Sequence, residues 1–279
     1  MNGAKRVVLG RQMIFAYAFG LVFFTVFAAV RSHAYFFSHG ETGNDALFRR
    51  DLAGEKGETA DGGAVNLEAV DAAAFNQAAD FINGNRISTL KRGFDITISL
   101  SILAFLAPLM IAVAIAIKLD SPGPVMYRQK RVGFGGQLFN VLKFRSMMVG
   151  AESDGPQYAL PDDARVTRVG RIIRKFRIDE IPQAVNVLRG EMSFVGPRPE
   201  RPEFVRELEL EIPHYHCRHL IKPGITGWAQ VKYEYAASVE GARNKLRYDL
   251  YYIRHFSPAL DLVILAMTIR VALFGLGSR

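Results

Sequence analysis

Two adjacent carboxylates, Asp179 and Glu180, follow a run of cationic side chains and stand just before Pro182. Neighbouring residues on a helix point about 100° apart, so the two carboxylates can have different roles. One could coordinate a metal while the other handles a substrate atom, because Mg²⁺ is usually held by one or two carboxylates together with substrate phosphates. The alternative is structural: Asp179 could cap the helix that Pro182 opens. Taken alone, the pair does not decide between these roles.

Three further motifs place cations or tight turns where a phosphate could bind. FVGPRP is a proline-flanked turn that presents Arg198, whose planar guanidinium suits a phosphate group. KFRSM ends a predicted strand with Lys143 and Arg145, and IKPGITGW is a glycine- and proline-rich loop. Each motif alone is typical of a turn or a solvated charge. Together with the carboxylate pair, they are what phosphoryl transfer to or from a diphosphate requires.

The positive charge of the chain is concentrated in its centre. The formal net charge is +8, but residues 127–177 hold eleven bases and four acids, whereas residues 41–86 hold nine acids and four bases. A basic, non-repetitive region indicates an anionic partner, such as a phosphate, a nucleic acid or an anionic lipid surface.

The single cysteine and the histidines around it do not indicate a disulfide or a zinc site. Cys217 is the single cysteine, which excludes an intrachain disulfide and a cysteine zinc cluster. The histidines around it, in HYHCRH, lack the third well-placed ligand that a catalytic zinc requires. We therefore expect no zinc site there.

The elements that must position these motifs follow an α/β pattern from Leu119 onward. Two strand-like runs flank the glycines of GFGG and predict a β-hairpin; no Gly-Lys-Ser/Thr follows, so a phosphate-binding loop is disfavoured. Residues 168–177 and 181–188 predict two helices separated by a break. Residues 260–274 are apolar but carry two charges, which predicts an interfacial or core helix.

Two apolar segments are long enough to meet a membrane. Residues 12–30 carry no charge and predict a retained anchor rather than a signal peptide, because they exceed the usual apolar length of such peptides. Residues 96–117 would span about 33 Å as a straight helix, but Pro108 interrupts them. Basic residues flank both of their ends, which favours a helix that bends back to the cytoplasmic side, although a kinked spanning helix stays open. Residues 38–90 predict a partly disordered linker with one short helix.

Several long motifs, in order, resemble the bacterial polyprenyl-phosphate sugar-1-phosphate transferases, also called monotopic phosphoglycosyl transferases. The resemblance runs from about Lys91 to Arg279 and rests on KRGFDI, the mid-helix proline, KFRSM, RVGRIIRKFRIDEIPQ, MSFVGPRPERPEF, KPGITGWAQV and LRYDLYYIRHFSPALDL. It implies an α/β, helix-rich catalytic domain on the membrane, with a re-entrant helix broken at Pro108. It also implies transfer of a sugar 1-phosphate from a UDP-sugar to undecaprenyl phosphate, with Mg²⁺ and release of UMP.

The resemblance also implies roles for individual residues. Asp179 would be the nucleophile that forms an aspartyl-phosphosugar, which divides one difficult displacement into two easier ones. Glu180 would assist it, and Asp179, with Glu180 as a second candidate, would hold the metal. The residues that match phosphate- or substrate-binding positions are Lys143, Arg145, Arg174, Arg198 and Asp249.

The expected architecture is an anchor at 1–37, a linker at 38–90 and a transferase domain at 91–279, divided into re-entrant helix 91–118, catalytic region 119–258 and interfacial helix 259–279. The C-terminal sequence resembles that of family members that prime exopolysaccharide synthesis.

The resemblance implies a location at the bacterial inner membrane, with the catalytic domain facing the cytoplasm. It implies no nucleic-acid partner, and a homo-oligomer is left open. The alternative is a membrane-anchored, non-catalytic basic module that docks on anionic lipid or nucleic acid. The sequence does not decide which sugar is transferred.

Overall fold

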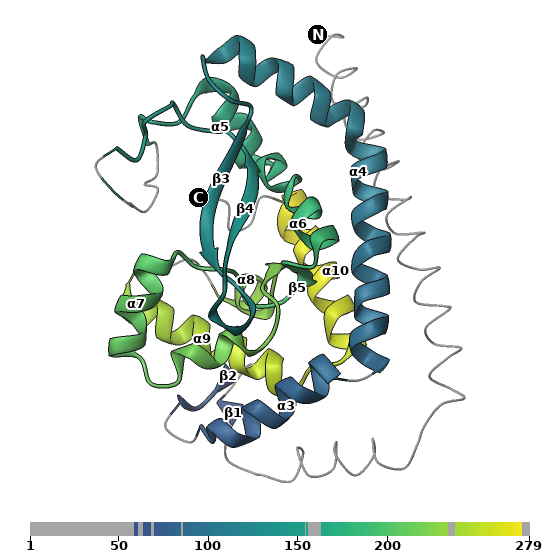
Figure 1. Ribbon diagram of the computed structural model, residues 1–279, viewed down its shortest axis with the longest axis vertical. Helices are drawn as coiled ribbons and strands as arrows, with labels where there is room; N and C mark the ends of the chain where they lie inside the picture. Colours follow the sequence, from purple (N-terminus) through teal and green to yellow (C-terminus); the bar gives the residue numbers. More distant parts are fainter. Residues whose placement is uncertain are drawn as a thin grey trace.

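The computed structural model describes residues 59–60, 64–67, 70–84, 86–153, 155, 163–233 and 238–274 of the 279-residue chain. The expected N-terminal membrane segment, residues 12–30, lies outside these ranges. Helices form most of the described chain, as the helix-rich prediction requires, and the strands pair in three short two-stranded sheets. Figure 1 shows a long helix, α4, along one side of a domain of shorter helices and strands.

The elements run in the order β1 (Thr59–Ala60), β2 (Ala64–Val65), α3 (Ala72–Gly84), α4 (Arg86–Asp120), β3 (Met126–Val132), η2 (Phe134–Gly136), β4 (Leu138–Phe144), α5 (Arg168–Lys175), η3 (Ile178–Glu180), α6 (Gln183–Arg189), β5 (Ser193–Val195), α7 (Pro202–Glu211), η4 (Tyr215–Leu220), β6 (Gly224–Thr226), α8 (Trp228–Lys232), α9 (Val239–Arg254) and α10 (Pro258–Phe274).

The predicted hairpin is confirmed. Strands β3 and β4 pair antiparallel, with Met126 opposite Phe144 at one end and Val132 opposite Leu138 at the other. Gly135 and Gly136 adopt φ values of 61° and 78° in the connection, a left-handed conformation that glycine allows without a Cβ clash. The hairpin carries Lys143 near the end of β4.

The predicted helices around the carboxylate pair are also confirmed, with a break between them. Thr167 caps α5, because its Oγ1 accepts a hydrogen bond from the Gly170 N–H at 2.9 Å. At Arg177 the backbone takes a left-handed φ of 53°, so the chain turns before the short 3-10 helix η3 begins. Asp179 and Glu180 therefore lie on a separate turn between α5 and α6.

Helix α4 contains a stretch, Ser88–Asp120, that is the one among the described residues long and apolar enough to cross a membrane, by length and composition. Pro108 lies inside this helix. The α4 ribbon in Figure 1 bends before it reaches β3, and a proline inside a helix is the usual cause of such a bend. In the structure, α4 thus continues through Pro108 as one helix that bends.

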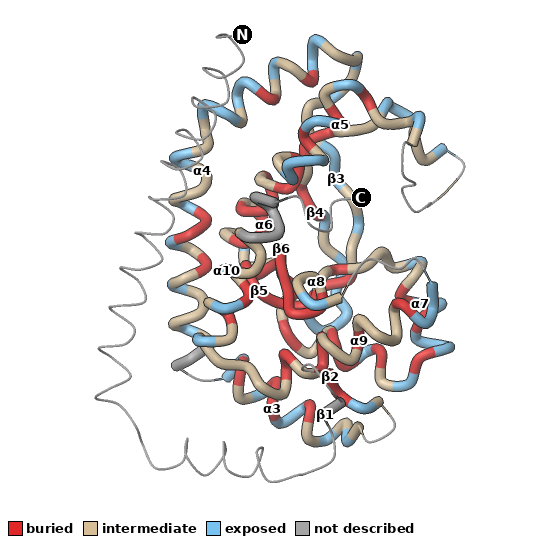
Figure 2. Tube along the Cα trace, turned by 180° about the vertical axis from the view of Figure 1, so that it is seen from behind, coloured by how far each residue is buried: buried red, intermediate tan, exposed pale blue. Residues whose placement is uncertain are grey.

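Both ends of α4 are attached to the same domain. Near its beginning, the Asp95 carboxylate accepts a hydrogen bond from the Phe194 N–H at 2.9 Å. At its end, Asp120 accepts one from the Val169 N–H at 2.9 Å, and Ile117 is buried against Phe144. Figure 2 shows that much of α4 between these points is exposed or only half-buried.

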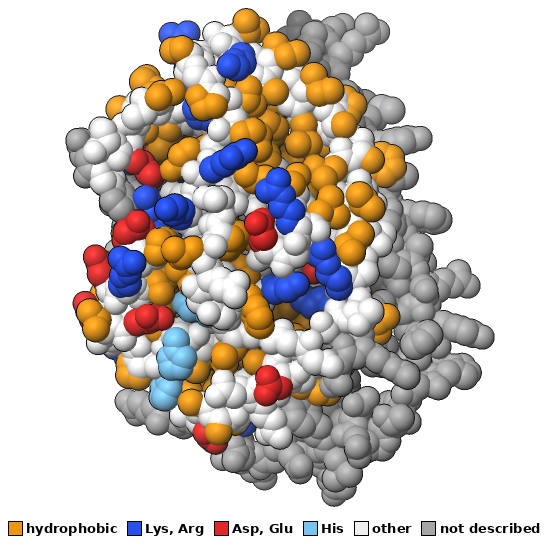
Figure 3. All heavy atoms as spheres, viewed as in Figure 1, with side chains coloured by type: hydrophobic (Ala, Val, Ile, Leu, Met, Phe, Trp, Pro, Cys, Tyr) orange, Lys and Arg blue, Asp and Glu red, His pale blue; other side chains and the backbone are white. Residues whose placement is uncertain are grey.

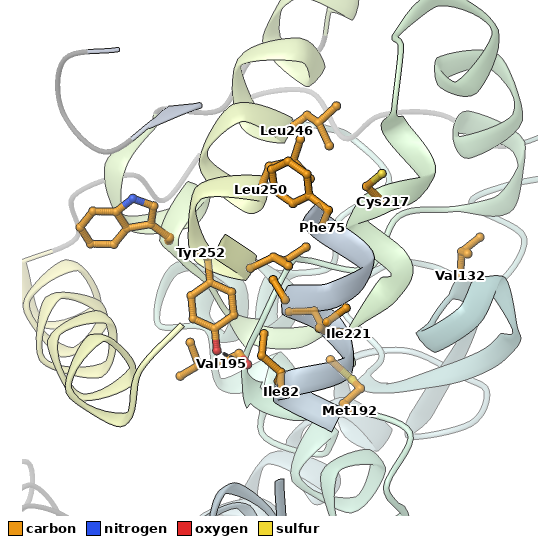
Figure 4. Packing of buried hydrophobic residues seen from close by; sticks show 14 of the residues in the cluster. Phe75, Ile82, Val132, Met192, Val195, Cys217, Ile221, Leu246, Leu250 and Tyr252 are labelled. Atoms are coloured by element: carbon orange, nitrogen blue, oxygen red, sulfur yellow. Dashed lines mark hydrogen bonds between the residues drawn. The ribbon is translucent and has the colours of Figure 1, made fainter. Parts of the chain in front are cut away.

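The main core lies between α3, α9, η4 and the β5–β6 sheet. Phe75 of α3 packs with Cys217, Leu246 and Leu250, as Figure 4 shows. Helix α3 is the short helix expected within residues 38–90, and its buried side chains belong to the same core as α9. Residues 72–84 are thus packed against the catalytic region.

Candidate active site

The carboxylate pair lies at the meeting point of three elements. Asp179 and Glu180 on η3 are buried, with exposed fractions of 8% and 9%. Lys143 reaches Glu180 from β4, and Arg198 reaches Glu180 from the turn that follows β5. Lys143 is 37 residues from Glu180 in the sequence, and Arg198 is 18 residues from it. Only the fold brings these three residues together.

Glu180 is held by cations. Lys143 Nζ donates a hydrogen bond to Glu180 Oε1 at 3.0 Å, and Arg198 Nη2 donates to the same oxygen at 2.6 Å. Arg177 Nη1 lies 3.9 Å from the other oxygen, Oε2. Burial alone would raise the pKa of Glu180, but Arg198 and Lys143 outweigh it and hold the pKa well below its usual range. Glu180 is therefore an anion at neutral pH.

Asp179 has the opposite electrostatic character. Burial, together with the negative charge of Glu180, raises the pKa of Asp179 to about 6, although Lys143, Arg174 and Arg198 oppose this shift. No hydrogen bond to the Asp179 carboxylate occurs among the described residues. The carboxylate next to a fixed ion pair is therefore the one left available to a reacting atom, and it is ionised above about pH 6.

Of the other predicted phosphate-binding residues, Arg174 lies near the carboxylate pair and Arg145 does not. Arg174, in the last turn of α5, contributes positive charge that lowers the pKa of Asp179. Arg145 lies elsewhere: its guanidinium donates to the carbonyl oxygens of Ser121 and Pro122 and so fixes the loop after α4. Its contacts in the described structure are with this loop, not with the carboxylate pair.

Asp249 is also separated from the carboxylate pair. It lies in α9 with an exposed fraction of 2%, and its Oδ2 is 2.8 Å from Nη2 of Arg218. Burial raises the pKa of Asp249, although Arg218 and Lys245 oppose the shift. A carboxylate enclosed in this way makes no contact with Asp179 or Glu180 in the described structure.

Two arginines that the motifs did not indicate also support the site. Arg218 donates to the carbonyl oxygen of Arg198 at 2.9 Å, and Arg131 donates to the carbonyl oxygen of Pro199 at 3.1 Å. Both therefore hold the backbone of the turn that carries Arg198. The sequence signal for Arg218 is weak, because it stands among the histidines of HYHCRHL, and the signal for Arg131 is only its place in a basic run.

The described residues contain no group of three or more His, Cys, Asp and Glu side chains that could hold a metal ion. His219 is neutral at physiological pH, because burial and the neighbouring Arg218 lower its pKa to about 3. The donor chemistry of Asp179 and Glu180 fits Mg²⁺ when substrate phosphates complete the coordination, since Mg²⁺ commonly takes one or two carboxylates with phosphate oxygens and water.

Comparison with known proteins gives consistent matches. The profile of the family described as "Bacterial sugar transferase" matches residues 86–275. The chain is 49% identical over 204 residues to a UDP-N-acetylgalactosamine-undecaprenyl-phosphate N-acetylgalactosaminephosphotransferase of Aeromonas hydrophila, covering 73% of this chain and 48% of the relative. It is 46% identical over 190 residues to an undecaprenyl-phosphate glucose phosphotransferase of Komagataeibacter xylinus, covering 66% and 36%.

A shorter relative matches over most of its length. The chain is 43% identical over 187 residues to the "Exopolysaccharide production protein PSS" of Rhizobium leguminosarum bv. phaseoli, covering 64% of this chain and 93% of the relative. By contrast, the match spans about half or less of the two longer relatives. The family match, residues 86–275, covers α4 and the domain that carries the carboxylate pair.

Proposed function

Because the chain belongs to the bacterial sugar transferase family, the polyprenyl-phosphate sugar-1-phosphate transferases, we propose that it transfers a sugar 1-phosphate from a UDP-sugar to undecaprenyl phosphate. The observation that carries this proposal is the asymmetry of the carboxylate pair. Glu180 is fixed by Lys143 and Arg198, whereas Asp179 has a raised pKa and no hydrogen-bond partner in the described structure. A buried, unpaired carboxylate is suited to nucleophilic attack.

The reaction proceeds by two displacements at one phosphorus atom. An oxygen of Asp179 attacks the phosphate next to the sugar, the bond from that phosphorus to the bridging oxygen breaks, and UMP leaves with the electron pair. An oxygen of undecaprenyl phosphate then attacks the same phosphorus, and the Asp179 carboxylate leaves. The product is undecaprenyl-diphosphate-sugar, and Asp179 is regenerated for the next turnover.

The surrounding charges have separate tasks in this scheme. Lys143 and Arg198 hold Glu180, and the guanidinium and ammonium groups also place positive charge where a diphosphate would enter. Arg174 adds charge on the Asp179 side. Mg²⁺, when bound, neutralises the charge of the diphosphate; Asp179 would hold it, with Glu180 as the second candidate ligand.

The arrangement of α4 supports a re-entrant membrane helix. Lys91 near its beginning lies 2.6 Å from Asp261 of α10, and Ile117 near its end is buried against the hairpin. A helix attached to one domain at both ends and bent between them enters the membrane and returns on the same side more readily than it crosses. Large apolar side chains are exposed along it: Leu100, Phe105, Leu109, Ile111, Ile115 and Leu119.

The exposed face of the domain fits this orientation. Figure 3 shows hydrophobic side chains gathered along α4, with lysine and arginine side chains beside them. Apolar side chains can enter the acyl region while cations meet lipid phosphates at the interface. The domain would then lie on the cytoplasmic face of the bacterial inner membrane, where its soluble donor is found.

The names of the relatives include both N-acetylgalactosamine and glucose transferases, and one relative is named for exopolysaccharide production. These names favour a priming role in the synthesis of an exopolysaccharide or another glycoconjugate. They do not select one sugar.

The test is release of UMP. Detergent-purified protein is incubated with undecaprenyl phosphate, Mg²⁺ and a panel of UDP-sugars that includes UDP-glucose, UDP-galactose and UDP-N-acetylgalactosamine. We expect UMP release with at least one donor, dependent on undecaprenyl phosphate for turnover. If no donor gives UMP and the protein instead binds DNA or anionic vesicles in a salt-sensitive manner, the non-catalytic docking module is the better assignment.

A further inference from the structure

A second ion pair, between Arg218 and Asp249, is buried away from Glu180. The side chains of Arg218 and Asp249 have exposed fractions of 4% and 2%, and Arg218 Nη2 lies 2.8 Å from Asp249 Oδ2. Burying such a pair is costly unless its members are satisfied, and the loss of one member leaves an uncompensated charge. Neither Arg218 nor Asp249 takes part in the proposed transfer of the sugar phosphate.

Arg218 connects this pair to the active site. Its Nη1 donates to the Tyr215 hydroxyl at 2.6 Å, and its Nη2 also donates to the carbonyl oxygen of Arg198 at 2.9 Å. Arg198 in turn donates from its side chain to Glu180 Oε1 at 2.6 Å. A continuous series of contacts therefore runs from Asp249 through Arg218 and Arg198 to Glu180.

The turn that carries Arg198 is fixed on its other side by the backbone of β6. Gly196 N–H donates to the carbonyl oxygen of Thr226 at 2.9 Å, and Gly224 N–H donates to that of Pro197 at 2.9 Å. These bonds hold the start of the turn. The contact from Arg218 adds a hydrogen bond at the carbonyl of Arg198 itself.

The two elements that supply the ion pair are rigidly packed. Arg218 lies on η4 and Asp249 on α9, and both elements pack with α3 in the main core. Figure 4 shows Cys217, next to Arg218, facing Leu246, Leu250 and Phe75. The Arg218 guanidinium therefore has a fixed position, because both η4, which carries it, and α9, which carries Asp249, are well packed.

Building on the proposed function, we propose that Arg218, oriented by Asp249, is a positioning residue that holds the Arg198 turn so that the Arg198 guanidinium meets Glu180. Asp249 then acts through Arg218 and touches neither the donor nor a metal ion. This differs from the substrate-binding role that the resemblance implied for Asp249.

The test compares Arg218→Lys with Tyr215→Phe, each alone and in an Arg198→Ala background. Lysine keeps the positive charge opposite Asp249 but loses the fork that reaches the Arg198 carbonyl as well. Tyr215→Phe removes a partner of Arg218 that is not on the route to Arg198. The measured quantity is kcat/KM for UMP release, with the melting temperature of each variant recorded.

We expect Arg218→Lys to lower kcat/KM by about tenfold or more in the parent protein, but by no more than about threefold when Arg198 is already alanine. Tyr215→Phe should cost less than about threefold in both backgrounds. If Arg218 were only a general stabiliser of the fold, the same factor would be lost in both backgrounds. That result, or an equal loss for Tyr215→Phe, overturns the proposal.

Hydrogen–deuterium exchange of the peptide that covers residues 194–201 gives a readout independent of activity. We expect faster exchange in Arg218→Lys, but not in Tyr215→Phe, while peptides from α6 stay unchanged. If Arg218→Lys does not fold, Asp249→Asn takes its place, with the same expected pattern. Unchanged exchange at 194–201 in the folded variant overturns the proposal.

These two readouts separate this inference from the proposed function. A wild-type protein that releases no UMP with any donor contradicts the transferase assignment, while the exchange comparison still tests the link from Arg218 to the Arg198 turn. A wild-type protein that is active, combined with additive losses, contradicts the positioning role alone.

Discussion

Two carboxylate–guanidinium clusters lie on either side of Arg198, and they differ in their access to solvent. In the cluster around Glu180, the side chains of Lys143 and Arg198 keep exposed fractions of 18% and 31%. In the cluster around Asp249, the side chains of Arg218 and Asp249 have exposed fractions of only 4% and 2%. We call the first the open cluster and the second the closed cluster.

The difference indicates a division of tasks. The charges of the open cluster are partly solvated, so an incoming diphosphate can replace water on Lys143 and Arg198. The charges of the closed cluster are already desolvated and can only hold neighbouring groups in place. We therefore expect changes in the open cluster to act mainly on the reaction, and changes in the closed cluster to act first on stability.

The largest expected effect is on the reaction, at Asp179, the proposed nucleophile beside the open cluster. Asp179→Asn should lower UMP release by at least about 10⁴-fold, equivalent to roughly 5.5 kcal/mol of transition-state stabilisation, because the amide cannot form the covalent phosphosugar. Intact-mass spectrometry should show the phosphosugar adduct in the parent protein and none in the variant. Glu240→Gln, on the exposed start of α9, serves as the control with normal activity.

Persistent exchange of labelled UMP into UDP-sugar by Asp179→Asn would exclude the covalent role of Asp179. The open cluster would then have to activate a different nucleophile.

In the closed cluster, Asp249→Ala should lower the free energy of unfolding by about 3–5 kcal/mol, because it leaves the Arg218 charge buried without its partner. Denaturant unfolding in detergent, followed by fluorescence, measures this loss. Glu180→Ala is the matched change in the open cluster and should cost much less, since Lys143 and Arg198 retain contact with water. Equal losses at the two sites would remove the distinction between the clusters.

The pH dependence tests the open cluster. Asp179 must be ionised to attack, and burial with the Glu180 charge raises its pKa to about 6, so kcat/KM should fall as the pH drops through about 6. Glu180→Gln removes the neighbouring negative charge and should move this inflection to lower pH. An inflection that does not move would show that another group controls the acidic limb.

The same shift has a consequence for stability. Because the pKa of Asp179 is raised in the folded protein, its contribution is favourable below the unfolded pKa and is lost as the pH rises through about 6. Above that pH, Asp179→Asn should be more stable than the parent by up to about 3 kcal/mol. Denaturant midpoints at pH 5 and pH 8 test this, with a smaller difference expected at pH 5.

The smallest effect is expected at the edge of the open cluster. Arg177 lies 3.9 Å from Glu180, and its side chain is 43% exposed. An exposed pair at this distance contributes little, so Arg177→Gln should change stability by less than about 1 kcal/mol and kcat/KM by less than about threefold. A larger loss of activity, with an unchanged melting temperature, would extend the active site to Arg177.

The sequence by itself determined the parts that depend on local chemistry. Turn residues and strand alternation predicted the β3–β4 hairpin, and helical spacing with Pro182 predicted the break around Asp179. The apolar run with Pro108 predicted a long membrane-associated helix interrupted at the proline, and the structure shows one continuous helix that contains Pro108. Several motifs in order then indicated the family and, with it, a site of Asp179, Glu180, Lys143, Arg145, Arg174, Arg198 and Asp249. The structure brings Lys143 and Arg198 into contact with Glu180.

Only the tertiary structure decided how the charges are paired. Motif position could not show that Arg145 holds the loop after α4, or that Asp249 is enclosed with Arg218. Nor could it show that the ion pairs fall on Glu180 and leave Asp179 unpaired. The reason is physical: burial and pairing depend on side chains that meet across tens of residues of chain, and these long-range contacts set the pKa of each carboxylate.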